Sequence, residues 1–361
     1  MAAGQKINEQ GKNSVTCQKS KRIDYIDIMK AIGIISVVVG HYWAPSVLGY
    51  IIWSFHMPLF VMISGYFLKD GISVSRLKKL CKSYLVPYSI VWGCNAVLLS
   101  VNNVILHTFS AEWLCNYIKS YFWALGSNSV LFKPESISKV GVIWFLMALF
   151  WGELMMLCLL RLCRRWQAQI GAIICIWLAA LYVSGRWCLP FGILNGISFL
   201  PWLYLGHVIK LFREKMPGRA QNNKTYILCI LSAVIVWFCV LFIQYRSGWK
   251  FSIAEFSIPK FILGLAGAAA AIYIIREISK KVPPGFWKKK LISVGQATIW
   301  ILCVHGIGIE VVSPIVNQIV YRPSLQCMVM IIRLILDIVI ALSLKKMWRI
   351  LKGIRHGKEY I

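Results

Sequence analysis

Ten apolar segments of 18–23 residues follow one another along the chain, separated by short polar stretches. An α-helix of about 20 apolar residues crosses the roughly 30 Å hydrocarbon core of a bilayer. The composition agrees, with 58% hydrophobic residues and a mean hydropathy of +0.67. We therefore predict an all-α integral membrane protein, a polytopic bundle of about ten transmembrane helices. Their ranges are 26–43, 47–68, 84–106, 141–161, 167–184, 192–211, 225–244, 257–276, 291–312 and 326–346.

The net charge of +27 is distributed as expected for a membrane protein rather than a nucleic-acid-binding one. Thirty of the 40 lysines and arginines lie in the two ends of the chain and in alternate connecting segments, whereas the other connections hold seven. Positive residues mark the cytoplasmic side of membrane proteins. The pattern predicts that both termini are cytoplasmic. It also predicts a multi-pass protein of the plasma membrane, with lipids and not nucleic acid as partners.

Three regions are expected on this basis: a cytoplasmic basic tail at 1–22, a membrane domain at 23–346 and a second cytoplasmic basic tail at 347–361. The N-terminus carries no cleavable signal. In the long outer loop at 107–140, the aromatic-rich stretch 112–123 predicts either an interfacial helix or an ordinary aromatic belt. The cysteines show neither Cys-x-x-Cys pairs nor Cys/His zinc spacing, so we predict no metal site.

Two ionisable residues interrupt the first apolar segment, Lys30 and His41. Eleven helical steps of about 100° bring a helix back to within roughly 20°, so both side chains share one face, about 16 Å apart along the axis. Charged groups at such depth are costly and indicate a functional polar path. A purely structural alternative is that Lys30 pairs with Asp27 while His41 caps the helix at the interface.

The second segment carries another polar block, Ser54-Phe55-His56-Met57-Pro58, followed by Ser64-Gly65-Tyr66-Phe67. Together with Lys30 and His41, this block closely resembles the membrane-bound acyltransferase-3 family, in particular its branch of fucose 4-O-acetylase-like sugar O-acetyltransferases. The resemblance covers nearly the whole chain. Weaker matches in the right order are Trp144-Phe145-Leu146, Pro201 to Gly206, and Ser293-Val294-Gly295 followed by Ile299 to His305.

Two positions depart from the family pattern. Lys30 stands where relatives often carry arginine, and the acidic pair that some relatives carry after the tryptophan of the fourth segment is absent. Leu149 and Phe150 occupy its place, and Glu153 is the nearest acid.

The resemblance implies transfer of an acetyl or other short acyl group from cytoplasmic acyl-CoA to a sugar hydroxyl. The acceptor would be a surface or exported glycan or a lipid-linked sugar, acetyl-CoA would be a co-substrate, and no cofactor would be bound. A hydroxyl needs a general base that titrates near working pH, which an imidazole provides. His41 could deprotonate the acceptor or carry the acyl group itself, and Lys30 could hold the thioester oxygen or a CoA phosphate.

Further candidates are less specific. His56 is a third catalytic candidate or an interhelical hydrogen-bonding group beside a kink at Pro58. The acids Asp27 and Glu153, with His305, are expected to bind substrate or line the pore, whereas Arg333 and Asp337 are expected to neutralise each other at i,i+4 spacing. One basic cluster could bind CoA phosphates, although membrane topology and contact with anionic lipid are the favoured explanation of it. It consists of Arg76, Lys78, Lys79 and Lys82.

Two other functions would also place charges inside a membrane. A transporter or flippase of a small molecule or lipid-linked sugar would show half-to-half symmetry, and none is evident in the sequence. A third interpretation is a non-catalytic membrane scaffold for a glycan-assembly complex. The sequence thus favours an acyltransferase (EC class of transferases moving groups other than aminoacyl groups), with transport as the alternative.

Overall fold

A computed structural model describes residues 23–42, 46–69, 71–126, 137–215, 222–249, 253, 256–314, 316 and 323–357. The regular secondary structure of these residues is helical, with no strand among them. The first half contains α1 (Asp24–Tyr42), α2 (Ser46–Trp53), α3 (His56–Phe67), α4 (Val74–Leu80), the π-turn η1 (Cys81–Leu85), α5 (Val86–Ile105) and α6 (Ala111–Trp123). The middle contains η2 (Gly141–Ile143), α7 (Trp144–Leu162), α8 (Trp166–Ser184), η3 (Pro190–Gly192), α9 (Ile193–Ser198) and α10 (Leu200–Lys215). The last third contains α11 (Asn223–Ser247), α12 (Ile258–Lys281), α13 (Phe286–Gly295), α14 (Thr298–Ile307), η4 (Gly308–Val312) and α16 (Pro323–Gly357).

The predicted membrane-spanning segments are confirmed as helices. Within the described residues, eight helices are long and apolar enough to cross a membrane, and two bent pairs raise the number to ten. The bends measure 49° between α9 and α10 and 65° between α13 and α14. Hydropathy alone predicts these two spans as ordinary helices, because a break of a few residues hardly changes the mean hydropathy of a window.

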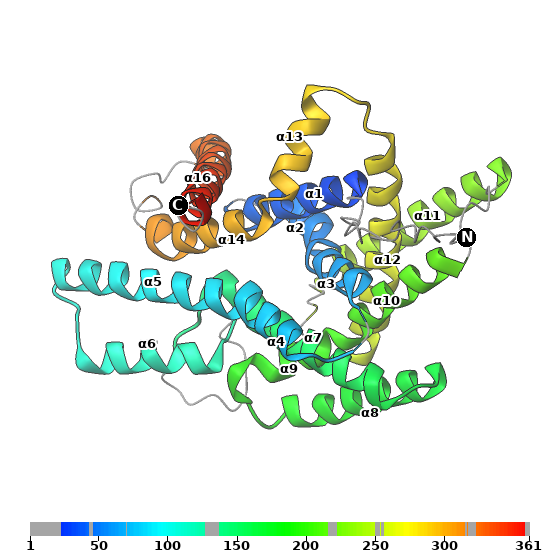
Figure 1. Ribbon diagram of the computed structural model, residues 1–361, viewed down its shortest axis with the longest axis horizontal. Helices are drawn as coiled ribbons and strands as arrows, with labels where there is room; N and C mark the ends of the chain where they lie inside the picture. Colours follow the sequence, from blue (N-terminus) through cyan, green and yellow to red (C-terminus); the bar gives the residue numbers. More distant parts are fainter. Residues whose placement is uncertain are drawn as a thin grey trace, which may run out of the picture.

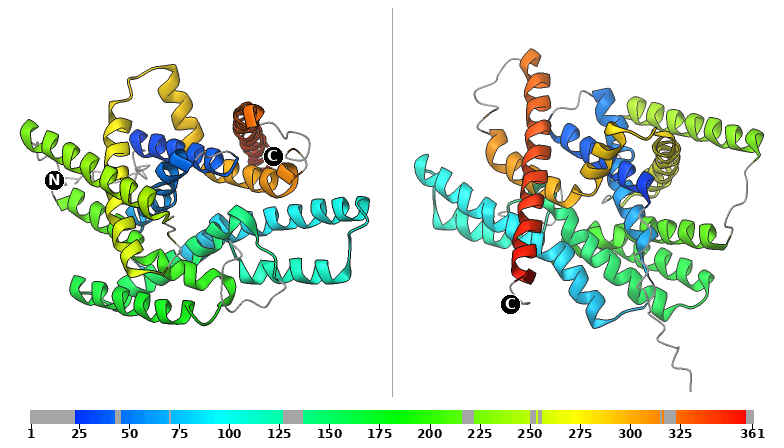
Figure 2. Two further views of the ribbon diagram at one scale, coloured as in Figure 1. Left: turned by 180° about the vertical axis from the view of Figure 1, so that it is seen from behind. Right: turned by 45° about the horizontal axis from the view of Figure 1, so that its top comes forward.

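The helices form two groups that face each other across the centre of the bundle. Figure 1 shows α4 to α9 (cyan to green) on one side and α1, α2, α13 and α14 on the other. α7 is the most enclosed span, with 72% of its apolar window buried, whereas α11 has 6% buried and is therefore a peripheral, lipid-facing helix. α16 runs along one side of the molecule as a single long helix (Figure 2).

Glycines let the central helices approach closely. A Cβ on Gly65 of α3 would overlap the Leu203 carbonyl of α10, and one on Gly206 of α10 would overlap the Met62 carbonyl of α3. Gly295, at the end of α13, likewise faces the backbone of Asp27 on α1. Small residues at such crossings allow close van der Waals packing, which holds helices together in lipid where no hydrophobic driving force acts between them.

The break in the second span lies before His56 and not at the expected kink after it. α2 ends at Trp53, and α3 begins at His56 with Pro58 in its first turn. A proline is tolerated there because its missing N–H would have had no intrahelical partner. His56 is therefore the first residue of a new helix rather than a residue in the middle of a continuous one.

Candidate functional site

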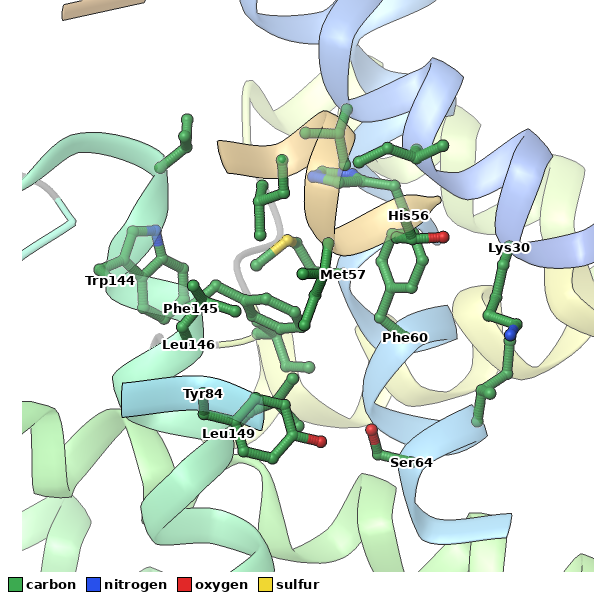
Figure 3. Close-up of a pocket in the computed structure, with 18 of the residues that line it drawn as sticks. Lys30, His56, Met57, Phe60, Ser64, Tyr84, Trp144, Phe145, Leu146 and Leu149 are labelled. Carbon is green, nitrogen blue, oxygen red and sulfur yellow. The ribbon is translucent and has the colours of Figure 1, made fainter. Parts of the chain in front are cut away.

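A cavity of about 410 Å³ lies between the two groups of helices, and Figure 3 shows part of its wall. This volume is typical of small-molecule sites. Side chains from α1, α3, η1, α7 and α14 line it, most of them apolar. They include Phe60, Ile63, Val142, Trp144, Phe145, Leu146, Leu149, Ile299 and Leu302.

One stripe of α1 forms a wall of this cavity. Lys30, Ile34, Val37 and His41 all line it, at spacings of four, three and four residues. This is the periodicity of one helical face. The structure thus places the two predicted polar side chains at separate positions along one cavity, with apolar residues between them.

Lys30 belongs to a small polar cluster. Its ammonium lies 2.6 Å from the carboxylate of Asp27, and Gln296 donates a hydrogen bond of 3.2 Å to the same carboxylate. Asp27 is buried, whereas Lys30 and Gln296 both reach the cavity. The local ion pair considered as the structural alternative is therefore present, and it presents the cation to the cavity rather than withdrawing it.

His56 faces the cavity with one ring nitrogen already engaged (Figure 3). Its Nδ1 lies 2.8 Å from the carbonyl oxygen of Ile52, at the end of α2. Because a carbonyl only accepts, Nδ1 carries the proton and Nε2 keeps a lone pair. His56 thus satisfies the carbonyl at a helix end, and its catalytic role stays a prediction.

Glu153 lies behind the cavity wall and not on it. Tyr84, placed by the π-turn η1, donates a hydrogen bond of 2.5 Å to Glu153, and Ser64 also bonds this carboxylate. Tyr84 and Ser64 themselves line the cavity, at its lower end in Figure 3. Glu153 would therefore act on a molecule bound in the cavity through the hydroxyls of Tyr84 and Ser64.

The basic cluster of α4 and η1 lies outside the cavity lining. Lys78, Lys79 and Lys82 are exposed, and Arg76 donates to the carbonyls of Lys69 and Gly71. Arg76 and Lys79 are close enough to act electrostatically on Glu153, so the cluster borders the end of the cavity formed by Tyr84 and Ser64. Phosphate binding by these residues stays a prediction.

His305 is fully buried and does not line the cavity. Its ring stacks on that of His41, with centroids 5.6 Å apart and an angle of 26° between the planes. Its Nδ1 lies 3.0 Å from the carboxylate of Asp337, which also accepts a 3.0 Å hydrogen bond from Tyr42. His305 is therefore a partner of His41 rather than a pore-lining residue.

The expected pairing of Arg333 with Asp337 is wrong. In the described part of the chain Arg333 donates to Ser313 and lies over the ring of Tyr42. Asp337 is bound instead by Tyr42 and His305, from 295 and 32 residues away. An acid four residues after an arginine predicts a local pair, and only the tertiary structure reveals the competing partners.

A comparison with protein-family models now identifies the chain. Residues 23–343 match the acyltransferase domain of the acyltransferase-3 family. The chain belongs to this family. No curated protein and no solved structure matches it significantly.

This acyltransferase therefore combines a helical membrane domain with a cavity whose lining includes Lys30, His41 and His56. Family membership makes the protein an acyltransferase and leaves the roles of individual residues as predictions. Tyr42, Tyr84 and Gln296 were not singled out by the sequence. The position of Tyr42 next to His41 is the one signal that could have drawn attention to it.

Proposed function

We propose that this acyltransferase moves an acetyl or other short acyl group from cytoplasmic acyl-CoA to a sugar hydroxyl of a surface or exported glycan. The carrying observation is the α1 wall of the cavity, which joins a cation at Lys30 to an imidazole at His41. The spacing along α1 separates the two by about 16 Å. Acyl transfer between two membrane faces needs a site in which a donor from one side meets an acceptor from the other.

In the proposed reaction His41 takes the proton of the acceptor hydroxyl while the hydroxyl oxygen forms a bond to the acyl carbon. The carbon–sulfur bond of the thioester breaks, and the CoA thiolate leaves and takes up the proton from His41. A positioned imidazole contributes roughly 10²- to 10⁴-fold to such a step. His56, which lines the cavity and keeps a lone pair on Nε2, would bind a further hydroxyl of the acceptor.

The donor is proposed to enter near Tyr84 and Ser64, where the basic cluster of Arg76, Lys78, Lys79 and Lys82 would bind its phosphates. This end is cytoplasmic by the distribution of positive charge. Lys30 would then hold a phosphate of the CoA arm, which leaves the thioester near His41, about 16 Å away along α1. The apolar wall formed by Phe60, Phe145 and Leu149 suits a short acyl chain.

The test compares cells that lack the protein with cells that express the wild type, His41→Ala or His107→Ala. His107 is an exposed histidine outside the cavity and serves as the matched control. Ester-linked short acids released by alkali from the surface glycan are quantified, together with the amount of each variant in the membrane. We expect the esters to be restored by the wild type and His107→Ala but not by His41→Ala.

The donor is tested in permeabilised cells supplied with radiolabelled acetyl-CoA. Label should enter the glycan fraction with the wild type and His107→Ala but not with His41→Ala, and unlabelled propionyl-CoA should compete. Full ester content with His41→Ala would refute the catalytic assignment. Unchanged esters in cells that lack the protein would refute the glycan acceptor.

A further inference from the structure

Asp337 is a buried acid in the middle of α16 whose recorded partners include no lysine or arginine. Its carboxylate accepts hydrogen bonds from the Tyr42 hydroxyl and the His305 ring, each 3.0 Å long. Gly308 leaves room for this arrangement, because a Cβ there would lie 2.8 Å from the Tyr42 hydroxyl. A carboxylate at membrane depth is costly, and by default it indicates function.

Bonding to Asp337 fixes the tautomer of His305. A carboxylate accepts, so the His305 Nδ1 donates and the Nε2 carries a lone pair. That Nε2 is buried and has no hydrogen-bond partner. The ring of His41 stacks on the His305 ring, with the two centroids 5.6 Å apart. A buried polar atom without a partner is rare, and here it belongs to the ring that stacks on the residue proposed to receive a proton.

We propose that Asp337, acting through His305, stabilises the positive charge that His41 acquires when it takes the proton of the acceptor. This inference rests on the function proposed for His41. No proton needs to reach Asp337, because the proton that His41 receives passes to the departing thiolate. The stabilisation is catalytic because the charge on His41 exists during the reaction and not before it.

The other groups around His41 make this partner necessary. His305 from α14, His56 from α3 and Lys139 from the segment before η2 act on His41 electrostatically, and none of them is an anion. Lys139 is faced by Glu310, while Arg333 of α16 bonds Ser313. Lys30, further along α1, is paired with Asp27. Among the described residues, the recorded contacts of His41 lead to one carboxylate, that of Asp337 through His305.

The same bonds also tie α1, α14 and α16 together, so charge and structure must be separated. Asp337→Asn keeps an oxygen that can accept from His305 and Tyr42 but removes the charge. Tyr42→Phe removes one of the bonds and keeps the charge. A structural role predicts that both variants lose stability to a similar extent, whereas the electrostatic role predicts that only Asp337→Asn loses turnover.

The experiment measures initial rates of acyl transfer in permeabilised cells at varied acetyl-CoA, normalised to the amount of each variant in the membrane. We expect Asp337→Asn to lower kcat at least roughly tenfold with KM for acetyl-CoA unchanged within about twofold. We expect Asp337→Glu to recover part of the rate and Tyr42→Phe to stay within about threefold of the wild type.

His305→Asn provides a second variant if Asp337→Asn does not accumulate in the membrane. An asparagine amide can donate to Asp337 from nearly the position of Nδ1, so the fold is kept while contact with His41 is lost. We expect kcat to fall with this variant as well. If His41→Ala is inactive but Asp337→Asn or His305→Asn has the wild-type kcat, the inference about Asp337 is overturned and the proposed function stands. An active His41→Ala would overturn the proposed function itself.

Discussion

Gly295 is the position where a single added methyl group should disturb both the fold and the site. A Cβ at this position would overlap the carbonyl oxygen of Asp27 and lie 2.6 Å from its carbonyl carbon, where ordinary contact begins at 3.4 Å. The end of α13 must therefore withdraw from α1 by more than about 0.8 Å, because this difference clears the carbonyl carbon alone and the overlapping oxygen is nearer still. Gln296, the next residue, would then lose its hydrogen bond to Asp27.

The cost of Gly295→Ala follows from these two effects. Overpacking of a close contact costs about 1–3 kcal/mol, and a lost hydrogen bond to a charged group about 1.5–3 kcal/mol. Together they predict destabilisation by about 2.5–6 kcal/mol. Acyl transfer should also fall, because Gly295 and Gln296 line the cavity beside Lys30.

The measurement is the apparent melting temperature of the detergent-solubilised protein, followed by fluorescence-detected size exclusion, together with acyl transfer in cells. The matched control is Gly93→Ala on α5, where a Cβ would meet no atom within 4 Å. Alanine is favoured over glycine in a helix by about 1 kcal/mol, so this control should melt at or slightly above the wild-type temperature. Equal melting temperatures and activities of the two variants would refute the packing argument.

Three further predictions concern the cavity wall. Lys30→Met should reduce the amount of protein in the membrane and abolish acyl transfer, because an unpaired buried charge at Asp27 costs about 3–5 kcal/mol. Lys30→Arg should retain the protein and the transfer. Immunoblots measure the amount of protein, and the ester content of the glycan measures transfer. Leu149→Trp should narrow the acyl site, so competition assays should show propionyl-CoA losing more affinity than acetyl-CoA, and equal losses would contradict this. Tyr84→Phe should lower stability by about 1.5–3 kcal/mol because Glu153 loses a donor, which thermal melts would detect.

The spans and the polar stripe of α1 could be predicted because both depend on local sequence periodicity. The positions of Lys30 and His41 within one helix determine that they share a face, whatever packs against it. The pairing of Lys30 with Asp27 at i−3 is local in the same way. Such features need only the geometry of a single helix.

The surroundings of His41 could not be predicted, because they depend on contacts between distant segments. His305 and Asp337 come from α14 and α16, and their contact with the end of α1 is decided by the bend after α13 and by Gly308. The i,i+4 spacing of Arg333 and Asp337 on one helix predicts that they pair with each other. In the folded protein the competing bonds from Tyr42 and His305 decide its partner.

The two cations of the proposed mechanism, Lys30 and protonated His41, interact with their carboxylates in different ways, and the difference suits their roles. The carboxylate partner of Lys30, Asp27, lies 2.6 Å from its ammonium on the same helix. His41 would be charged only during transfer, and the carboxylate of Asp337 reaches it through a second imidazole. Between the two ends the α1 stripe is apolar, with Ile34 and Val37 on the cavity wall. A continuous chain of polar groups across the membrane would conduct protons, so this apolar interval admits the acyl-bearing arm of the donor between Lys30 and His41 while it interrupts a path for protons.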